Sequence, residues 1–157
     1  MNGILEIGLA VVSAILGYHL YVIDCILYAF YLHPEDETSR HLREQIKQRR
    51  YWLALRMMLM MNATPKHYIH KSIKFLAAFI VMAVFVVTST TSVLGRGFVV
   101  GFGVYLFIEL LRVYKNPTLL RAKFFWDLSR EVKDETIRTL THVCMVFSVL
   151  VTAFALL

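Results

Sequence analysis

Asp24, Glu109 and His142 each interrupt a long apolar stretch of this sequence. A charged group held among hydrocarbon is costly, so such groups usually face a protein interior, pair with one another or line a water path. A count of about 1.5 Å of helix rise per residue from the charged flanks places the three groups at overlapping depth. We therefore expect one polar layer, built from three different helices, of the kind that passes protons or ions.

Three tyrosines and two arginines accompany these residues at helical spacing. A buried hydroxyl can hydrogen-bond a carboxylate, and a guanidinium can pair with it. A structural interpretation is therefore an alternative to conduction. In it, the acids and arginines form ion pairs between helices, and the tyrosines complete the hydrogen bonds. The accompanying residues are Tyr21, Tyr28 and Tyr105 in the polar layer, with Arg112 and Arg138 as the charge partners.

The elements that must position these residues are apolar helices. Of the 157 residues 58% are hydrophobic and 18% are charged, whereas a soluble domain has about 45–50% apolar and about 25% charged residues. A helix needs about 20 apolar residues to cross a bilayer. The sequence therefore predicts an all-α polytopic integral membrane protein, a single membrane domain with four transmembrane helices at about residues 4–32, 73–94, 98–114 and 137–157.

Two charged connections separate these segments, at residues 35–61 and 117–133. In both, apolar residues recur at helical spacing and the opposite face is basic, which predicts two amphipathic helices on the membrane surface. Because lysine and arginine favour the cytoplasmic side, we expect the connections in the cytoplasm and both termini outside, in a plasma or inner membrane. The 94–97 turn between the second and third spans should also lie outside. The residues expected at anionic lipid headgroups are Arg49, Arg50, Trp52, Arg56, Lys123, Trp126 and Arg130.

Glycines mark two helix faces that should contact protein instead of lipid. Gly17 lies on the polar stripe of the first span, and Gly97 and Gly101 form a GxxxG element at the start of the third. Small residues let two helix backbones approach closely. The two faces together predict extensive helix packing and assembly into a homo-oligomer or a larger membrane complex.

Several classes of site are not indicated. Cys25 and Cys144 form no CxxC spacing, and the histidines lack convergent carboxylates or cysteines, so neither a metal nor another cofactor is expected. The net charge of +6 comes from basic residues beside the spans, where anionic lipid is a nearer partner than nucleic acid. No phosphate-loop, HExxH or GxSxG motif is present, and no catalytic residue is assigned.

Three functions are compatible with these features. The first is a small oligomeric pore, channel or transport subunit that conducts ions or protons past Asp24, Glu109 and His142. The alternative is a non-catalytic accessory or scaffold subunit of a membrane complex, which binds anionic lipid through its basic amphipathic helices. The third is a membrane enzyme that acts on lipid, with one of the same three residues in an acid–base role.

Overall fold

The computed structural model describes residues 3–63, 68–89, 92–128 and 132–156, and all regular structure within these ranges is helical. The chain is all-α, as the sequence predicted. In chain order the elements are α1 (Gly3–Tyr18), α2 (Leu20–Leu27), a π-helical turn η1 (Tyr28–Leu32), α3 (Glu37–Lys47), α4 (Tyr51–Ala63), a 3₁₀ turn η2 (Ile69–Lys71), α5 (Ile73–Ser89), α6 (Val93–Val113), α7 (Pro117–Phe124) and α8 (Asp134–Leu156).

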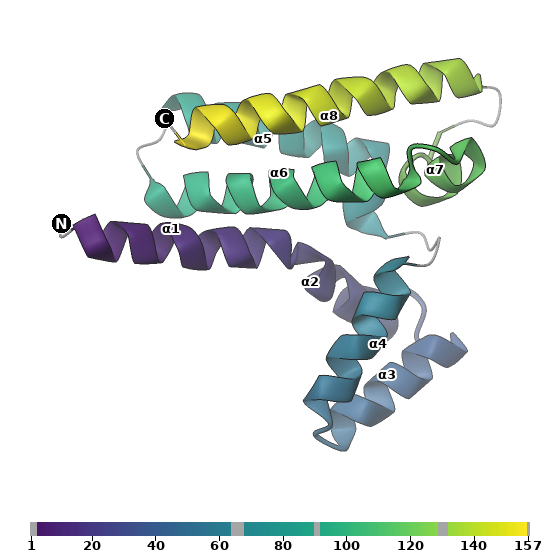
Figure 1. Ribbon diagram of the computed structural model, residues 1–157. Coiled ribbons are helices and arrows are strands. Elements are labelled where there is room, and N and C mark those ends of the chain that lie inside the picture. Colours follow the sequence, from purple (N-terminus) through teal and green to yellow (C-terminus); the bar gives the residue numbers. More distant parts are fainter. Residues whose placement is uncertain (1–2, 64–67, 90–91, 129–131, 157) are drawn as a thin grey trace.

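Four of these helices, α1, α5, α6 and α8, form a bundle with α6 between α1 and α8 (Figure 1). Among the residues that the structure describes, three helical segments are long and apolar enough to cross a membrane: Gly3–Leu32, Val93–Val113 and Asp134–Ala155. The fourth predicted span corresponds to α5, an apolar helix of 17 residues. The fold is therefore compatible with an integral membrane protein that has three candidate spanning helices.

The first segment bends at His19, which separates α1 from α2. The backbone there leaves the helical region (φ −93°, ψ 16°), while the His19 N–H still donates to the carbonyl oxygen of Ile15 at 3.0 Å. Beyond the bend, α2 turns away from the line of α1 towards α4 (Figure 1). The bend is important because it carries Asp24 away from the close contact between α1 and α6.

Helices α1 and α6 touch backbone to backbone, and the three predicted packing glycines lie at this contact. A Cβ atom added to Gly17 would overlap the carbonyl oxygen of Phe98, and one added to Gly101 would overlap that of Ala14. Gly97 also lies against the α1 backbone. Such close approach is what small residues permit between apolar helices.

Three predicted boundaries differ from the structure. The expected 94–97 turn is helical, because α6 begins at Val93 and the Ser92 hydroxyl caps it by accepting from the Gly95 N–H at 3.3 Å. The expected helix at 35–61 is two helices, separated where Arg49 adopts a left-handed conformation with φ 58°. The expected helix at 117–133 ends already at Phe124.

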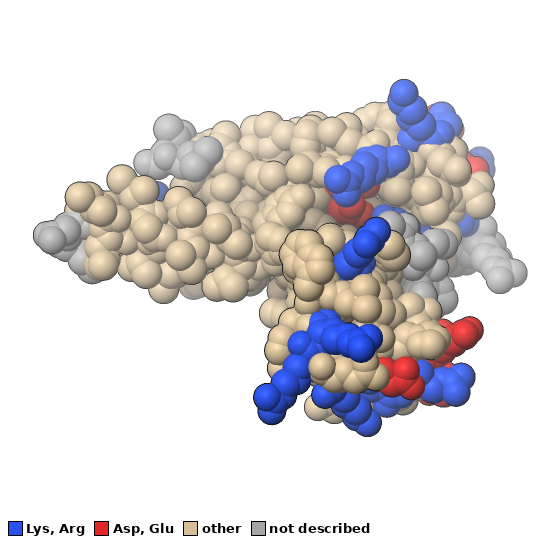
Figure 2. All heavy atoms as spheres, turned by 60° about the horizontal axis from the view of Figure 1, so that its bottom comes forward, with Lys and Arg blue, Asp and Glu red and all other residues tan. Residues whose placement is uncertain are grey.

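Helices α3 and α4, which we call the basic hairpin, project sideways from the bundle near its α7 end (Figure 1). Figure 2 shows lysine and arginine side chains gathered over this hairpin and the adjoining end of the bundle. The opposite end of the molecule is almost free of charge on the face shown. The distribution of charge is therefore strongly polarised along the bundle.

Candidate functional site

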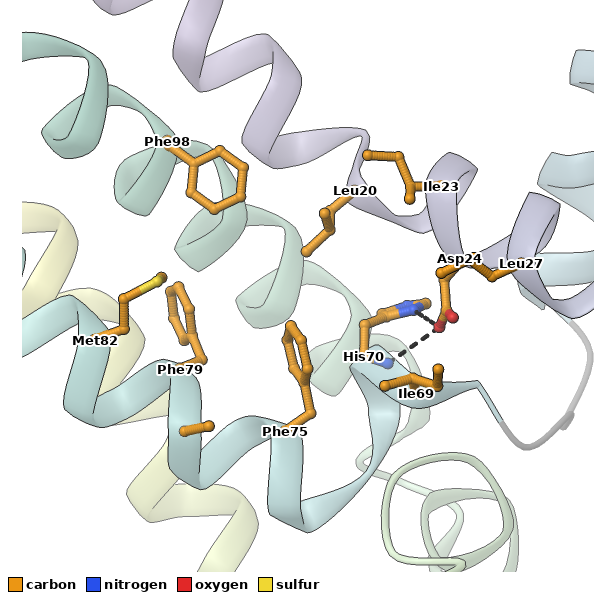
Figure 3. A pocket seen from close by; sticks show the side chains of 11 residues that line it. Leu20, Ile23, Asp24, Leu27, Ile69, His70, Phe75, Phe79, Met82 and Phe98 are labelled. Atoms are coloured by element: carbon orange, nitrogen blue, oxygen red, sulfur yellow. Dashed lines mark hydrogen bonds and ion pairs between the residues drawn. The ribbon is translucent and has the colours of Figure 1, made fainter. Parts of the chain in front are cut away.

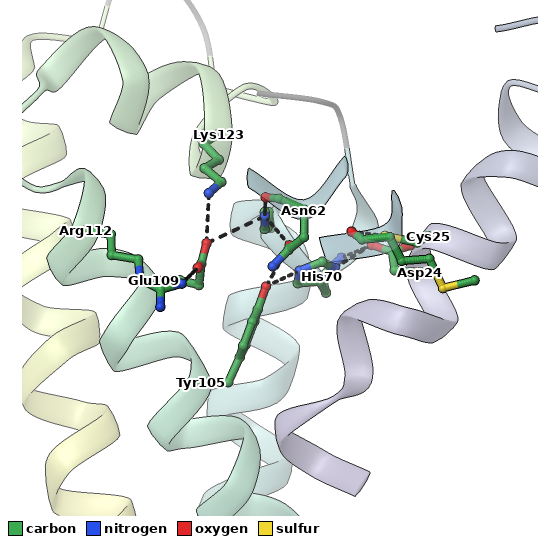
Figure 4. A network of polar contacts seen from close by, with 10 residues as sticks. Asp24, Cys25, Asn62, His70, Tyr105, Glu109, Arg112 and Lys123 are labelled. Carbon is green, nitrogen blue, oxygen red and sulfur yellow. Dashed lines mark hydrogen bonds and ion pairs between the residues drawn. The ribbon is translucent and has the colours of Figure 1, made fainter. Parts of the chain in front are cut away.

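A buried chain of polar side chains crosses the molecule where α2, α4, η2, α6 and α7 meet (Figure 4). We call it the polar network. Local features place most of its members: the bend at His19 directs α2, the 3₁₀ turn presents two consecutive residues inward, and Tyr105 and Glu109 lie one turn apart on α6. Its members are Asp24, Asn62, His70, Lys71, Tyr105, Glu109, Arg112 and Lys123.

His70 is held between a carboxylate and a phenol. The Asp24 Oδ2 atom accepts from the His70 backbone N–H at 3.0 Å and lies 2.6 Å from Nδ1 of the same residue. On the other side of the ring, Nε2 is 2.9 Å from the Tyr105 hydroxyl. The Asp24 and His70 side chains are only 6% and 2% exposed. Burial lowers the pKa of His70, although its hydrogen bond to Asp24 opposes this effect. In the neutral imidazole, Nδ1–H donates to Asp24 and Nε2 accepts from Tyr105.

Tyr105 and Asn62 extend the network from His70 to Lys71. The Tyr105 hydroxyl is also 3.0 Å from the side-chain oxygen of Asn62, so its single proton has two acceptors. That Asn62 oxygen accepts from Lys71 Nζ at 2.5 Å, and the Asn62 carbonyl oxygen accepts from Nζ at 2.7 Å. Burial, reinforced by the nearby charge of Lys123, lowers the pKa of Lys71 from its usual 10.5 to about 7.

Glu109 is the charge centre at the other end of the network. Its Oε2 atom accepts from Lys123 Nζ at 2.8 Å and lies 3.8 Å from Lys71 Nζ. Its Oε1 atom accepts from Arg112 at 2.7 Å. Glu109, Lys71 and Lys123 are all buried, while the Arg112 side chain extends to the surface. One buried carboxylate therefore balances several cations, an arrangement that is strongly destabilised if the carboxylate is removed.

Four residues of the predicted site join this network: Asp24, Tyr105, Glu109 and Arg112. Asp24 and Glu109 do not touch, because His70, Tyr105, Asn62 and Lys71 lie between them (Figure 4). Among the other predicted members, Tyr21 stacks on the Tyr105 ring, and Tyr28 donates to Asp36 at 3.4 Å.

His142 and Arg138 lie apart from the network, contrary to the expectation of one layer. Both residues are exposed on α8. The Nε2 atom of His142 lies 2.8 Å from the Tyr114 hydroxyl. Similar depth on different helices did not bring these groups together, because the face of α8 that carries them does not point at α2.

The predicted headgroup residues divide into two groups. Arg49, Arg50, Trp52 and Arg56 are exposed on the basic hairpin, as interfacial residues would be, and Trp126 is partly buried. Lys123 is a correction: it is buried against Glu109, since the carboxylate supplies the charge that makes its burial tolerable. Arg130 lies outside the described residues.

Asn62, His70 and Lys71 are the network residues that the sequence did not indicate. Asn62 lies at the end of α4, and His70 and Lys71 lie in the short polar connection to α5. This part of the chain resembles an ordinary interfacial segment when only composition is considered. The one available hint was that His70 and Lys71 are surrounded by Tyr68, Ile69 and Ile73, an apolar context for two basic residues. Among the described residues, no group of three or more histidine, cysteine or acidic side chains could hold a metal ion.

Comparisons of the chain with protein-family models, with curated proteins and with solved structures found no match.

Proposed function

We propose that the protein is a non-catalytic accessory or scaffold protein of a membrane, which presents the basic hairpin to anionic lipid at the membrane surface. The observation that carries this proposal is the polar network, because it ties the base of the hairpin to the bundle. Asn62, the second-to-last residue of α4, is bonded to Lys71 of η2 and to Tyr105 of α6. A hairpin anchored in this way has a fixed orientation relative to the bundle.

The exposed surface of the hairpin supports binding to an anionic membrane. Its side chains combine cations with apolar groups: Trp52 is 80% exposed, and Tyr51, Leu59 and Met60 are exposed as well. Each lysine or arginine near an anionic surface contributes about 1 kcal/mol of attraction. The exposed basic residues of the hairpin and its turn are Arg40, Lys47, Arg49, Arg50 and Arg56. Glu37 and Glu44 contact His41 on α3, which leaves the turn and α4 as the more strongly basic part.

The membrane topology that goes with this proposal has four spans and a cytoplasmic hairpin. The 17 residues of α5 cover roughly 26 Å at about 1.5 Å each, close to the hydrocarbon thickness of about 30 Å. Both termini would then lie outside. A reporter fused to the C-terminus tests this topology, since reporter activity in the cytoplasm would contradict it.

Tryptophan fluorescence tests the lipid contact. The chain has two tryptophans, so Trp126→Phe leaves Trp52 as the only one. This variant is reconstituted into vesicles of neutral phosphatidylcholine, with or without anionic phosphatidylglycerol. We expect brominated lipid to quench Trp52 more strongly in the anionic vesicles. Equal quenching in the two kinds of vesicle would overturn the proposal.

A matched pair of charge variants identifies the surface responsible. Arg49→Gln with Arg50→Gln removes two charges from the turn of the hairpin, and should remove most of the additional quenching in anionic vesicles. Lys133→Gln with Arg138→Gln removes two exposed charges near the start of α8. This control pair should leave the quenching unchanged. An equal loss in both pairs would indicate a general charge effect and would contradict a specific role for the hairpin.

Proton or ion conduction by several copies of the chain is a second candidate function. It is favoured by the series of polar groups from Asp24 to Glu109, which is hydrogen-bonded as far as Lys71 and ends in a 3.8 Å ion pair between Lys71 and Glu109. The series runs across the helices instead of along them (Figure 4). A complete path therefore requires an oligomer. Proton flux into vesicles that contain a pH-sensitive dye tests it: flux equal to that of empty vesicles, or flux unaffected by Glu109→Gln, contradicts conduction through this series.

A further inference from the structure

Two cavities of the bundle differ in the polar groups that a ligand could reach. The larger, of about 430 Å³, lies between α2, α5 and α6 (Figure 3). Its two ionisable lining residues, Asp24 and His70, are buried and bonded to each other, so they offer a ligand no accessible charge. The second, of about 390 Å³, is a groove between the first turns of α1 and α6, at the end of the bundle away from the basic hairpin. We call it the α1–α6 groove.

Two opposite charges line the α1–α6 groove without pairing. Glu6 of α1 and Arg96 of α6 are its only lining residues with polar side chains. Both are partly exposed, so a ligand in the groove can reach them. Among the described residues they form no ion pair with each other, and neither side chain has another polar partner. Because charged groups on apolar helices usually pair, the groove favours an occupant that supplies both an anion and a cation.

The two charges follow each other along the groove. Gly97 lies against Ala10 of α1, so the adjacent Arg96 is about one helical turn, roughly 5.4 Å, farther from the end of the bundle than Glu6. From the end inward, the order is therefore a carboxylate, a guanidinium and then an apolar wall. The residues of that wall are Val11, Ala14 and Val100.

A phospholipid with an ethanolamine head carries the complementary groups in the same order. Its ammonium group is outermost, its phosphate follows after two carbon atoms, and its hydrocarbon chains extend inward. The ammonium can donate to the Glu6 carboxylate, and the Arg96 guanidinium can donate to the phosphate, both as charge-assisted hydrogen bonds. A head with a phosphate and no cation would leave Glu6 unpaired and would be repelled by it.

We propose that the α1–α6 groove binds one phosphatidylethanolamine molecule from the leaflet opposite the basic hairpin, with its ammonium on Glu6, its phosphate on Arg96 and a chain along the apolar wall. This inference rests on α1 and α6 crossing a membrane. It does not rest on the lipid contact proposed for the hairpin, which is at the other end of the molecule.

Three lipids with the same dioleoyl chains and no net charge test the proposal: phosphatidylethanolamine, phosphatidylcholine and diacylglycerol. The purified protein in detergent is titrated with each, and bound lipid is counted by native mass spectrometry. We expect phosphatidylethanolamine to bind about tenfold or more tightly than diacylglycerol, since hydrogen bonds to charged groups account for such a ratio. Phosphatidylcholine has no N–H donor, so it should bind about threefold or more weakly than phosphatidylethanolamine. Equal affinity for the three lipids would show hydrocarbon contact alone and would overturn the proposal.

A matched pair of variants locates the site. Val11→Trp fills the α1–α6 groove and should weaken the binding of phosphatidylethanolamine about tenfold or more. Val12→Trp adds the same ring at the next position of α1, which is exposed and does not line the groove, and should leave binding unchanged. If both variants bound the lipid equally tightly, the groove would not be the site.

Two further variants separate the contacts of the head. Glu6→Gln removes the anion, so the preference for phosphatidylethanolamine over phosphatidylcholine should fall to near unity. Arg96→Gln removes the partner of the phosphate, so the preference for phosphatidylcholine over diacylglycerol should fall instead. Unchanged preferences in both variants would exclude these residues as the contacts. The same loss in both would contradict the assignment of one charge to each part of the head.

Discussion

The two ends of the α1–α6 pair use the same face of α6 in opposite ways. Gly97, Gly101, Tyr105 and Glu109 follow one another at four-residue intervals. At the glycine end, the two backbones touch, and a Cβ atom added to Gly17 or Gly101 would overlap a backbone carbonyl of the other helix. At the other end, Tyr105 and Glu109 reach into the polar network and bind residues from η2, α4 and α7.

The bend at His19 separates the glycine end of the helix pair from its polar end. Up to Gly17 the first segment stays in contact with α6, and after the bend α2 diverges. The space that opens is occupied by His70, which bonds to Asp24 on α2 and to Tyr105 on α6. One helix pair therefore contains a close contact between apolar helices and, directly beyond the bend, a buried polar site.

The largest loss of stability should come from removing the charge of Glu109, the charge centre of the polar end. Glu109→Gln leaves Lys71 and Lys123 buried without a carboxylate. We expect this change to destabilise the protein by about 3–5 kcal/mol, measured as the change in unfolding free energy of the purified protein in mixed micelles. Glu135→Gln, at an exposed position of α8, should be near neutral. Equal stability of the two variants would contradict the central role of Glu109.

A single added methyl group should disrupt the backbone contact between α1 and α6 at the glycine end. Gly101→Ala forces a Cβ against the Ala14 carbonyl oxygen and should destabilise the protein by about 1–3 kcal/mol. The same substitution at Gly8, where no atom lies within 4 Å of the added Cβ, is the control and should have little effect. If both variants unfolded at the same denaturant concentration, the backbone contact between α1 and α6 would not be important for stability.

The pH dependence of stability should distinguish the two ends, because the buried groups with lowered pKa values, His70 and Lys71, both lie at the polar end. The folded pKa of Lys71 is lowered to about 7 from 10.5, so between these values the unfolded state binds more protons. Stability should therefore rise with pH across this window, and the penalty of burying the charge should be fully present below pH about 7. His70, whose pKa is also lowered, should reduce stability further as the pH falls below 6.5.

Lys71→Met tests the assignment of this slope. It should remove most of the rise in unfolding free energy between pH 7 and about 10, measured in mixed micelles across a series of buffers. Lys74→Met replaces an exposed lysine on α5 and should keep the slope. A slope that persists in Lys71→Met would assign the pH dependence to another group.

The smallest effect should come from His142, which lies outside the network. Its contact with Tyr114 is at an exposed position, so His142→Ala should change the unfolding free energy by less than about 1 kcal/mol. His70→Ala removes the buried link between Asp24 and Tyr105 and should destabilise the protein considerably more. If His142→Ala destabilised the protein more than His70→Ala, His142 would lie in a buried site that is formed only between copies of the chain.

The elements of the fold could be predicted from local patterns in the sequence. Long apolar runs predicted helices, and each of the three candidate spanning segments of the described chain lies where the sequence predicted a span. The spacing of Gly97 and Gly101 predicted a close helix contact, which the structure places on α1. Boundaries were harder to predict, because the cap at Ser92 and the left-handed Arg49 depend on single residues within otherwise helical patterns.

The sequence by itself determined which residues are too polar for their surroundings: Asp24 and Glu109 were recognisable because each lies in an apolar helix. Only the tertiary structure decided their partners. Asp24 binds His70, 46 residues along the chain, and Glu109 binds Lys123 from a helix expected at the membrane surface. The physical reason is that helical periodicity specifies a face and a depth. The partner, by contrast, depends on where a bend, a 3₁₀ turn and a connecting segment place a second group, and none of these follows from periodicity.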